Sequence, residues 1–157
     1  MSNTSPPPID DALLAYLRVA LHCPALAFRS LPVAVQGGYD TRIFAFQLIG
    51  APEPFSGRLV IRVFQAVGEA SRAALEAAVQ NALAAGSYPV PPVLHVCTDP
   101  SVVGGAFTIM PLVPGRTLMS DTVALARHGA RLLAGAHLRL HAIDALAVLD
   151  SLAASGA

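Results

Sequence analysis

Lysine is absent from this sequence, and all ten of its basic residues are arginine. The absence excludes a phosphate-binding GxxxxGK[ST] loop, Schiff-base chemistry and a lysine general base. Charged residues of either sign are also scarce, at 13% of the chain, whereas 54% of residues are hydrophobic. This composition excludes disorder as the main state. Because ten acidic residues balance the arginines, we expect no broad positive surface for nucleic acid or an anionic membrane.

Cysteine is scarce as well. Cys23 and Cys97 lie far apart in the chain and suggest no disulfide framework. The sequence begins without the charged, apolar and small-residue segments of a signal peptide, so we expect a cytoplasmic protein with reduced thiols. No uncharged run of spanning length is free of proline and glycine, and residues 100–115 contain three of each. A membrane-spanning helix is therefore not expected.

Residue periodicity in the first half of the chain predicts a helix, three strands and a second helix. After a polar, proline-rich start, Asp10 is expected to cap a helix that Pro24 ends. Three β-rich runs follow at residues 31–35, 42–50 and 58–64. The alanine-rich residues 69–85 predict a helix, which Gly86 is expected to end in the left-handed C′ position.

The second half of the chain adds two strands and a long helix. Residues 89–99 and 105–113 are the strand candidates, with a turn at Gly104–Gly105 between them. Ser120 or Asp121 is expected to cap a helix that runs to about Asp150 with a break near Gly135. The order of elements favours an α+β fold, in which a five-stranded antiparallel sheet carries the 69–85 helix on one face.

The segments EAAVQNALAAGSYPVPPVL and GAFTIMPLVPGRTL carry a family resemblance. With QGGYDT upstream and LAGAHLRLHAIDAL downstream, their order resembles that of the aminoglycoside phosphotransferase and choline kinase family, from the N-terminal lobe to the first C-lobe helix. The resemblance covers roughly residues 30–146. It implies a protein-kinase-like N-lobe with its hinge at residues 31–113, preceded by a mobile tail and helix at 1–30 and followed by the start of a truncated helical C-lobe at 114–157.

The resemblance implies transfer of the ATP γ-phosphate to a hydroxyl of a small molecule, with Mg²⁺ as the metal. The family's catalytic loop, His-x-Asp-x-x-x-x-Asn, and its metal-binding Asp are missing here. The only asparagines are Asn3 and Asn81, and the acids after residue 99 are Asp121, Asp144 and Asp150, all in predicted helix. We therefore expect the nucleotide-binding part of such an enzyme, with no catalytic or metal-binding residues in this chain and no activity of its own.

The resemblance also implies which residues bind the nucleotide phosphates. The loop between the first two β-rich runs would do so with its backbone N–H groups and the Thr41 hydroxyl; its residues are Gly37, Gly38, Tyr39, Asp40 and Thr41. A plain hairpin turn is the alternative for a double glycine.

Arg62 stands where the family has a phosphate-binding Lys or Arg, and Glu76 by position would hold it. A charge in the middle of an apolar strand is costly unless it is paired. Arg58, Val60 and Arg62 could instead share a solvated face, and Glu69 is a rival partner that also suits the first turn of the helix.

The hinge would lie at residues 110–113. The resemblance implies that the Pro111 carbonyl accepts a hydrogen bond from the adenine amino group and that the Val113 N–H donates one to the ring. Met110 would border the adenine pocket, although core packing is the alternative for a methionine.

Three alternatives and one consequence remain open from the sequence. His137 and His141 could share a metal, but no third ligand is spaced to join them. A pseudokinase-like module that binds nucleotide or protein without catalysis, or a structural protein, would also fit the sequence.

The last helix has more leucines than one small sheet can cover. We therefore expect an exposed apolar surface near residues 106–146 and possible self-association through it.

Overall fold

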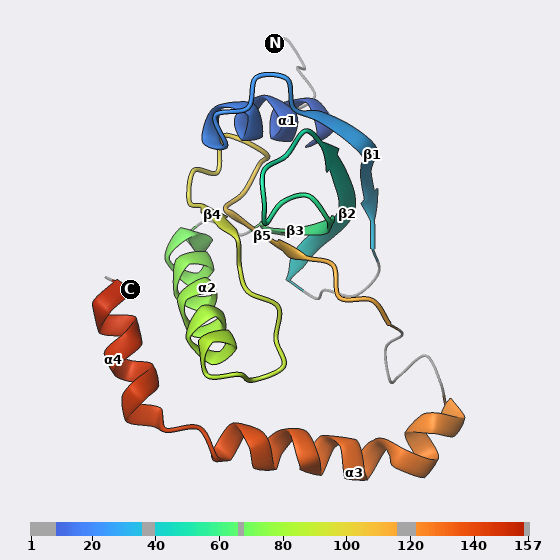
Figure 1. The fold of residues 1–157 in the computed structure, drawn as a ribbon, viewed down its shortest axis with the longest axis vertical. Helices are drawn as coiled ribbons and strands as arrows, with labels where there is room; N and C mark the ends of the chain where they lie inside the picture. Colours follow the sequence, from blue (N-terminus) through green and yellow to red (C-terminus); the bar gives the residue numbers. More distant parts are fainter. Residues whose placement is uncertain (1–8, 36–39, 66–67, 116–121, 156–157) are drawn as a thin grey trace.

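The computed structural model describes residues 9–35, 40–65, 68–115 and 122–155 (Figure 1). Helices and strands follow one another in the predicted order. They are α1 (Ile9–Ala20), β1 (Ala27–Ala34), β2 (Thr41–Ile49), β3 (Arg58–Phe64), α2 (Glu69–Ala85), β4 (His95–Cys97), β5 (Phe107–Pro111), α3 (Thr122–His141) and α4 (Ala145–Ser155). None of these helices is both long enough and apolar enough to cross a membrane.

The five strands form one antiparallel sheet in the order β1-β2-β3-β5-β4. The predicted α+β fold with a five-stranded antiparallel sheet is therefore confirmed. Strand β1 differs from its prediction because it begins at Ala27, which pairs with Ile49 of β2, rather than at residue 31. Its first residues lack a β-rich pattern, so their extended conformation depends on pairing with β2 and not on local preference.

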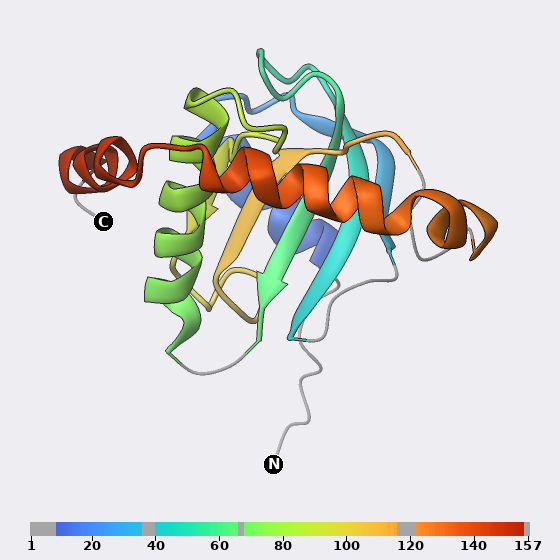
Figure 2. The same ribbon diagram turned by 90° about the horizontal axis from the view of Figure 1, so that it is seen from below.

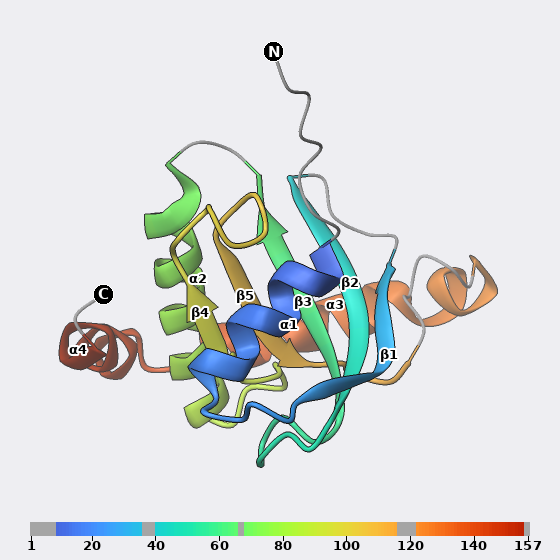
Figure 3. The ribbon, with the colours of Figure 1, turned by 90° about the horizontal axis from the view of Figure 1, so that it is seen from above.

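The sheet has one face covered by α1 and another that faces α2. Side chains on β3 alternate between the two faces. Leu59, Ile61 and Val63 are buried in the main core with Leu13 and Leu17 of α1. Figure 3 shows α1 lying across this face.

The other face meets α2, where a smaller buried cluster joins Phe64 of β3 to Ala73 of α2 and to Ala106. Helix α2 contacts β3, β4 and β5, and α4 packs beside α2. Figures 2 and 3 look from opposite sides and show α1 and α3 on opposite sides of the sheet. The larger apolar core therefore lies on the face that α1 covers, and the face toward α2 has only the smaller cluster.

The ends of the helices correct two predictions. Helix α1 begins at Ile9, so Asp10 lies in its first turn and does not precede it as a cap. Gly86 follows α2 with an ordinary φ of −76°, and Ser87 is the left-handed residue, with φ 62°. The N–H of Ser87 donates to Ala84 and that of Tyr88 to Leu83, each over 3.0 Å. This Schellman pattern satisfies carbonyls at the helix end and places Ser87, not glycine, at C′.

The C-terminal helical segment breaks later than predicted. Helix α3 runs through Gly135 without interruption and ends at His141. A glycine inside a helix costs only about 1 kcal/mol relative to alanine, which a long helix tolerates. The chain turns at residues 142–144, and α4 starts where the Leu146 N–H donates to the Asp144 carboxylate over 2.9 Å. The predicted caps Ser120 and Asp121 lie outside the described residues.

The apolar surface expected near residues 106–146 is present on α3 and α4 but not on β5, where Phe107 and Ile109 are fully buried in the core of the sheet. Leu132, Leu133, Leu138 and Leu146 have between 55% and 72% of their surface accessible. Self-association through this surface stays a prediction.

We expect Leu17→Ala to lower the free energy of unfolding by about 2 to 5 kcal/mol, because its fully buried side chain would leave a cavity between α1 and the sheet. The matched control is Leu138→Ala on α3, where the side chain is 72% exposed, and its effect should stay within about 0.5 kcal/mol. Urea unfolding of the two variants measures both. Equal losses would contradict the assignment of the core to the α1 face.

Candidate functional site

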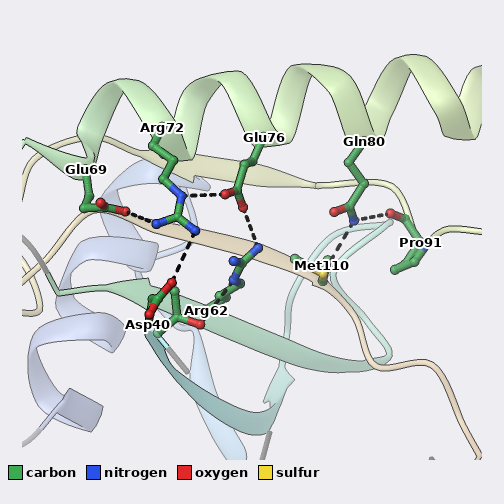
Figure 4. A network of polar contacts seen from close by, with 9 residues as sticks. Asp40, Arg62, Glu69, Arg72, Glu76, Gln80, Pro91 and Met110 are labelled. Carbon is green, nitrogen blue, oxygen red and sulfur yellow. Dashed lines mark hydrogen bonds and ion pairs between the residues drawn. The ribbon is translucent and has the colours of Figure 1, made fainter. Parts of the chain in front are cut away.

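An ion pair joins the middle of β3 to α2. Arg62 Nη1 donates to Glu76 Oε2 over 2.7 Å, and the two side chains are 30% and 34% exposed (Figure 4). The pairing expected from the sequence is therefore present. Glu69 does not take the place of Glu76, because it binds another arginine, and Glu53 instead accepts a hydrogen bond from Ser56.

Small residues on α2 allow Glu76 to reach the sheet. Ala73 and Ala77 are the two buried residues of the helix, and they lie one turn apart on the face that Glu76 borders. Val79, on the same helix, is half-buried. Alanines at the contact bring the helix axis close to the sheet, so a glutamate at its edge can meet an arginine that projects from β3.

Arg72 is a functional candidate that the sequence reasoning missed. Its Nε donates to Glu76 Oε1 over 2.7 Å and its Nη1 to Glu69 Oε2 over 3.0 Å. Its Nη2 lies 3.9 Å from Asp40 Oδ2, at the start of β2 (Figure 4). The signal was the spacing of Glu69, Arg72 and Glu76, which places opposite charges three and four residues apart on one helix face. The same spacing is common on solvated helices.

Both guanidinium groups lie over one aromatic ring. The Cζ atom of Arg62 is 4.7 Å from the centroid of the Phe64 ring, and that of Arg72 is 5.8 Å away. Phe64 itself is fully buried. The ring attracts both cations through its negative face and supports them where β3 ends.

The described end of the loop between β1 and β2 reaches this network. Thr41 is nearly buried, and its Oγ1 accepts a hydrogen bond from Arg62 Nε over 3.3 Å. Asp40 contributes the contact with Arg72, while 70% of its side chain remains exposed. The other loop residues with a predicted role, Gly37, Gly38 and Tyr39, lie outside the described residues.

The arginines keep Glu76 ionised. Burial by itself raises the pKa of this carboxyl, but the hydrogen bond from Arg72 and the charge and hydrogen bond of Arg62 outweigh that effect, so the pKa is lowered. The hydrogen bond to Glu76 and the charge of Glu69 raise the pKa of Arg72 in turn. Glu76 and Arg72 therefore each favour the charged form of the other.

The predicted hinge residues lie at the end of β5. Met110 is half-buried, and the amide of Gln80 on α2 lies 3.6 Å from its sulfur while donating to the Pro91 carbonyl over 2.6 Å (Figure 4). Pro111 pairs with Leu59 of β3.

Val113 lies beyond the strand and is 62% exposed. The N–H of Leu112, just before it, donates to the Arg58 carbonyl over 2.9 Å. Within the described part of the chain, the Val113 N–H has no hydrogen-bond partner, so this donor is available to a ligand.

A half-buried apolar strip connects Arg62 to Met110 on the α2 face. Residues that pair across an antiparallel ladder point to the same side of the sheet. Ile43 is opposite Arg62, Ala45 is opposite Val60, and Val60 is opposite Met110. These apolar residues are all half-buried. The arrangement could hold a flat apolar ring, with an anion at the Arg62 end.

Other chemistry finds little support in the described ranges. They contain no group of three His, Cys, Asp or Glu residues that could hold a metal ion. The His137 and His141 rings stack with centroids 6.0 Å apart on exposed helix surface. A cavity of about 620 Å³ lies elsewhere, between the end of α2 and α4, where Tyr88, Arg139 and Ile143 help to line it.

Comparison with known proteins identifies the family. The family model described as the phosphotransferase enzyme family matches residues 33–153. This chain belongs to the phosphotransferase enzyme family. The family expected from the sequence is therefore confirmed.

A solved structure from Ralstonia eutropha JMP134, provisionally named an aminoglycoside phosphotransferase, is 28% identical with a TM-score of 0.48. The match covers 68% of the phosphotransferase-family chain described here and 28% of the Ralstonia protein. The chain therefore spans little more than a quarter of the length of that relative. No curated protein matches the chain.

We expect Glu76→Gln to destabilise the protein in a pH-dependent way. Because the folded-state pKa of Glu76 is lowered, its ionised form stabilises the fold above the unfolded-state pKa of about 4.3, and this contribution is lost as the pH falls through the folded-state value. The difference in unfolding free energy between wild type and variant should therefore be present at pH 7 and shrink below about pH 4. Urea unfolding at several pH values measures it.

The matched control is Glu53→Gln, because Glu53 faces Ser56 and no arginine in the described residues. It should show no comparable pH-dependent difference. A constant difference for Glu76→Gln from pH 7 to pH 3 would show that the arginines do not hold the carboxylate.

Proposed function

We propose that this chain is the nucleotide-binding part of an ATP-dependent small-molecule phosphotransferase. Membership of the phosphotransferase enzyme family supports the reaction class. The proposal rests on the position of Arg62. Its guanidinium forms an ion pair with Glu76 over 2.7 Å, and it lies at one end of an apolar strip whose other end is Met110. A cation and a flat apolar surface on one face of a sheet suit the two parts of a nucleotide, the phosphates and the base.

In the proposed complex the adenine ring lies against Val60 and Met110. The Pro111 carbonyl accepts from the adenine amino group, and the Val113 N–H, which has no partner among the described residues, donates to the ring. The phosphates lie beside Arg62, whose guanidinium suits bidentate binding of phosphate oxygens.

The loop donors assigned to the phosphates are the backbone N–H groups of Gly37, Gly38, Tyr39 and Asp40, together with the hydroxyl of Thr41. The Thr41 hydroxyl accepts from Arg62, so it can donate its own proton to a phosphate oxygen. The loop and Arg62 would thus approach the same phosphates.

The described residues do not fit Mg²⁺. Asp40, Glu69 and Glu76 each face an arginine, and no metal-binding cluster is present in the described ranges. Phosphoryl transfer also needs a residue that orients the hydroxyl, and the sequence holds no His-x-Asp-x-x-x-x-Asn pattern. We therefore assign nucleotide binding to these 157 residues and the metal, the orienting residue and the hydroxyl substrate to groups outside them.

We expect ATP to bind without Mg²⁺ and Arg62→Gln to weaken that binding about tenfold or more, because the variant removes a charged hydrogen-bond donor to phosphate. Isothermal titration calorimetry measures the dissociation constants. Arg58→Gln is the matched control, since it removes the same charge from the same strand outside the ion-pair network. The proposal fails if wild type does not bind ATP, or if the two variants weaken binding equally.

We expect no release of ADP above background when the chain is mixed with ATP, Mg²⁺ and a panel of aminoglycoside or choline-like alcohols, because it lacks the loop that orients the hydroxyl. A coupled ADP assay checks this. Turnover that disappears in Arg62→Gln would contradict the expectation. A pseudokinase-like binding module is the alternative, and a longer chain that supplies the loop, binds ATP and still shows no turnover would select it.

A further inference from the structure

The charges of the ion-pair network do not balance. Two arginines, Arg62 and Arg72, face three carboxylates, those of Asp40, Glu69 and Glu76. A nucleotide that binds beside Arg62 adds several negative charges to the same place. Like charges at short range disfavour one another, so the complex is more stable if one of the three carboxylates moves away.

Asp40 is the carboxylate that is held least. It lies 3.9 Å from Arg72 and its side chain is 70% exposed, whereas Glu69 and Glu76 lie 3.0 Å and 2.7 Å from the same guanidinium and are 21% and 34% exposed. An exposed ion pair at this distance is weak. Asp40 can therefore leave Arg72 at little cost, while the two glutamates stay.

Arg72 is placed close to Arg62. The two guanidinium groups each donate to a different oxygen of the Glu76 carboxylate, over 2.7 Å in both cases. Both also lie over the ring of Phe64. Of the three nitrogens of Arg72, Nε and Nη1 are fixed by glutamates, and Nη2 is the one that faces Asp40.

We propose that Arg72 is a second phosphate-binding residue and that the Asp40 carboxylate occupies, in the unliganded protein, the position of a phosphate oxygen on Arg72 Nη2. This inference rests on the proposed nucleotide site and deepens it. Arg62 and Arg72 then form a clamp for two neighbouring phosphates of a polyphosphate chain. Asp40 acts as a displaceable counter-ion, which competes with the phosphates and departs when they bind.

Inorganic triphosphate is the most direct probe, because it lacks the base and reports on the phosphate position alone. Its dissociation constant, and that of ATP, are measured by calorimetry without Mg²⁺ for wild type, Arg72→Gln and Asp40→Asn. Arg58→Gln and Asp11→Asn are the matched controls, each removing one charge of the same sign outside the network. Thermal unfolding without ligand shows which variants are folded. If Arg72→Gln does not fold, Arg72→Lys, which keeps the charge, is measured in its place.

We expect Arg72→Gln to weaken triphosphate binding about tenfold, since a charged donor is lost. Arg72→Lys should weaken it less. Asp40→Asn should strengthen binding about threefold, because a competing exposed charge is removed.

The inference is overturned if Arg72→Gln binds triphosphate as Arg58→Gln does, or if Asp40→Asn leaves binding unchanged or weaker, which would make Asp40 a support for the loop. The nucleotide site survives both results as long as Arg62→Gln weakens binding of ATP. Failure of the wild type to bind either triphosphate or ATP removes the proposed function and this inference together.

Discussion

The alternation of side chains along β3 is the constraint on which the candidate site depends. Leu59, Ile61 and Val63 are buried with α1, so the residues between them must face the other way. A shift of the strand by one residue would place Arg62 in that apolar core, where an unpaired charge is very costly. The core on one face therefore fixes the position of the arginine on the other, and pairing with β2 and β5 on both sides holds it there.

Helix α2 completes the site because its inner face is made of small residues. Ala73 and Ala77 contribute little apolar area to bury, so polar contacts of Glu76 with Arg62 and of Asn81 with Val93 also hold the helix against the sheet. The contact of Glu76 also neutralises the charge of Arg62. Two arginines share the carboxylate of Glu76, so in the proposed complex binding of a nucleotide beside Arg62 would depend on the position of α2.

Strong local patterns made some elements predictable. Residues 58–64 and 69–85 were assigned their observed bounds, because an apolar β-rich run and an alanine-rich run leave little choice. The start of β1 depends on its pairing with β2, which the local sequence does not indicate. The left-handed conformation of Ser87 depends on the path of the segment that follows α2. Arg72 was missed because its spacing from Glu69 and Glu76 is equally typical of a solvated helix. The contacts of Arg72 with Phe64 and Asp40 distinguish a site residue from a residue on a solvated helix, and they are known only from the structure.

The central claim is that a nucleotide binds on the α2 face of the sheet, from Arg62 to the hinge. Titration of the ¹⁵N-labelled protein with ATP, followed by amide chemical shifts, tests it residue by residue. The account predicts saturable shifts at Val60, Arg62, Glu76 and Val113, with Leu13 and Leu17 of α1 unchanged. Shifts confined to the cavity between α2 and α4, near Tyr88 and Ile143, or the absence of any shift at millimolar ATP, would contradict it.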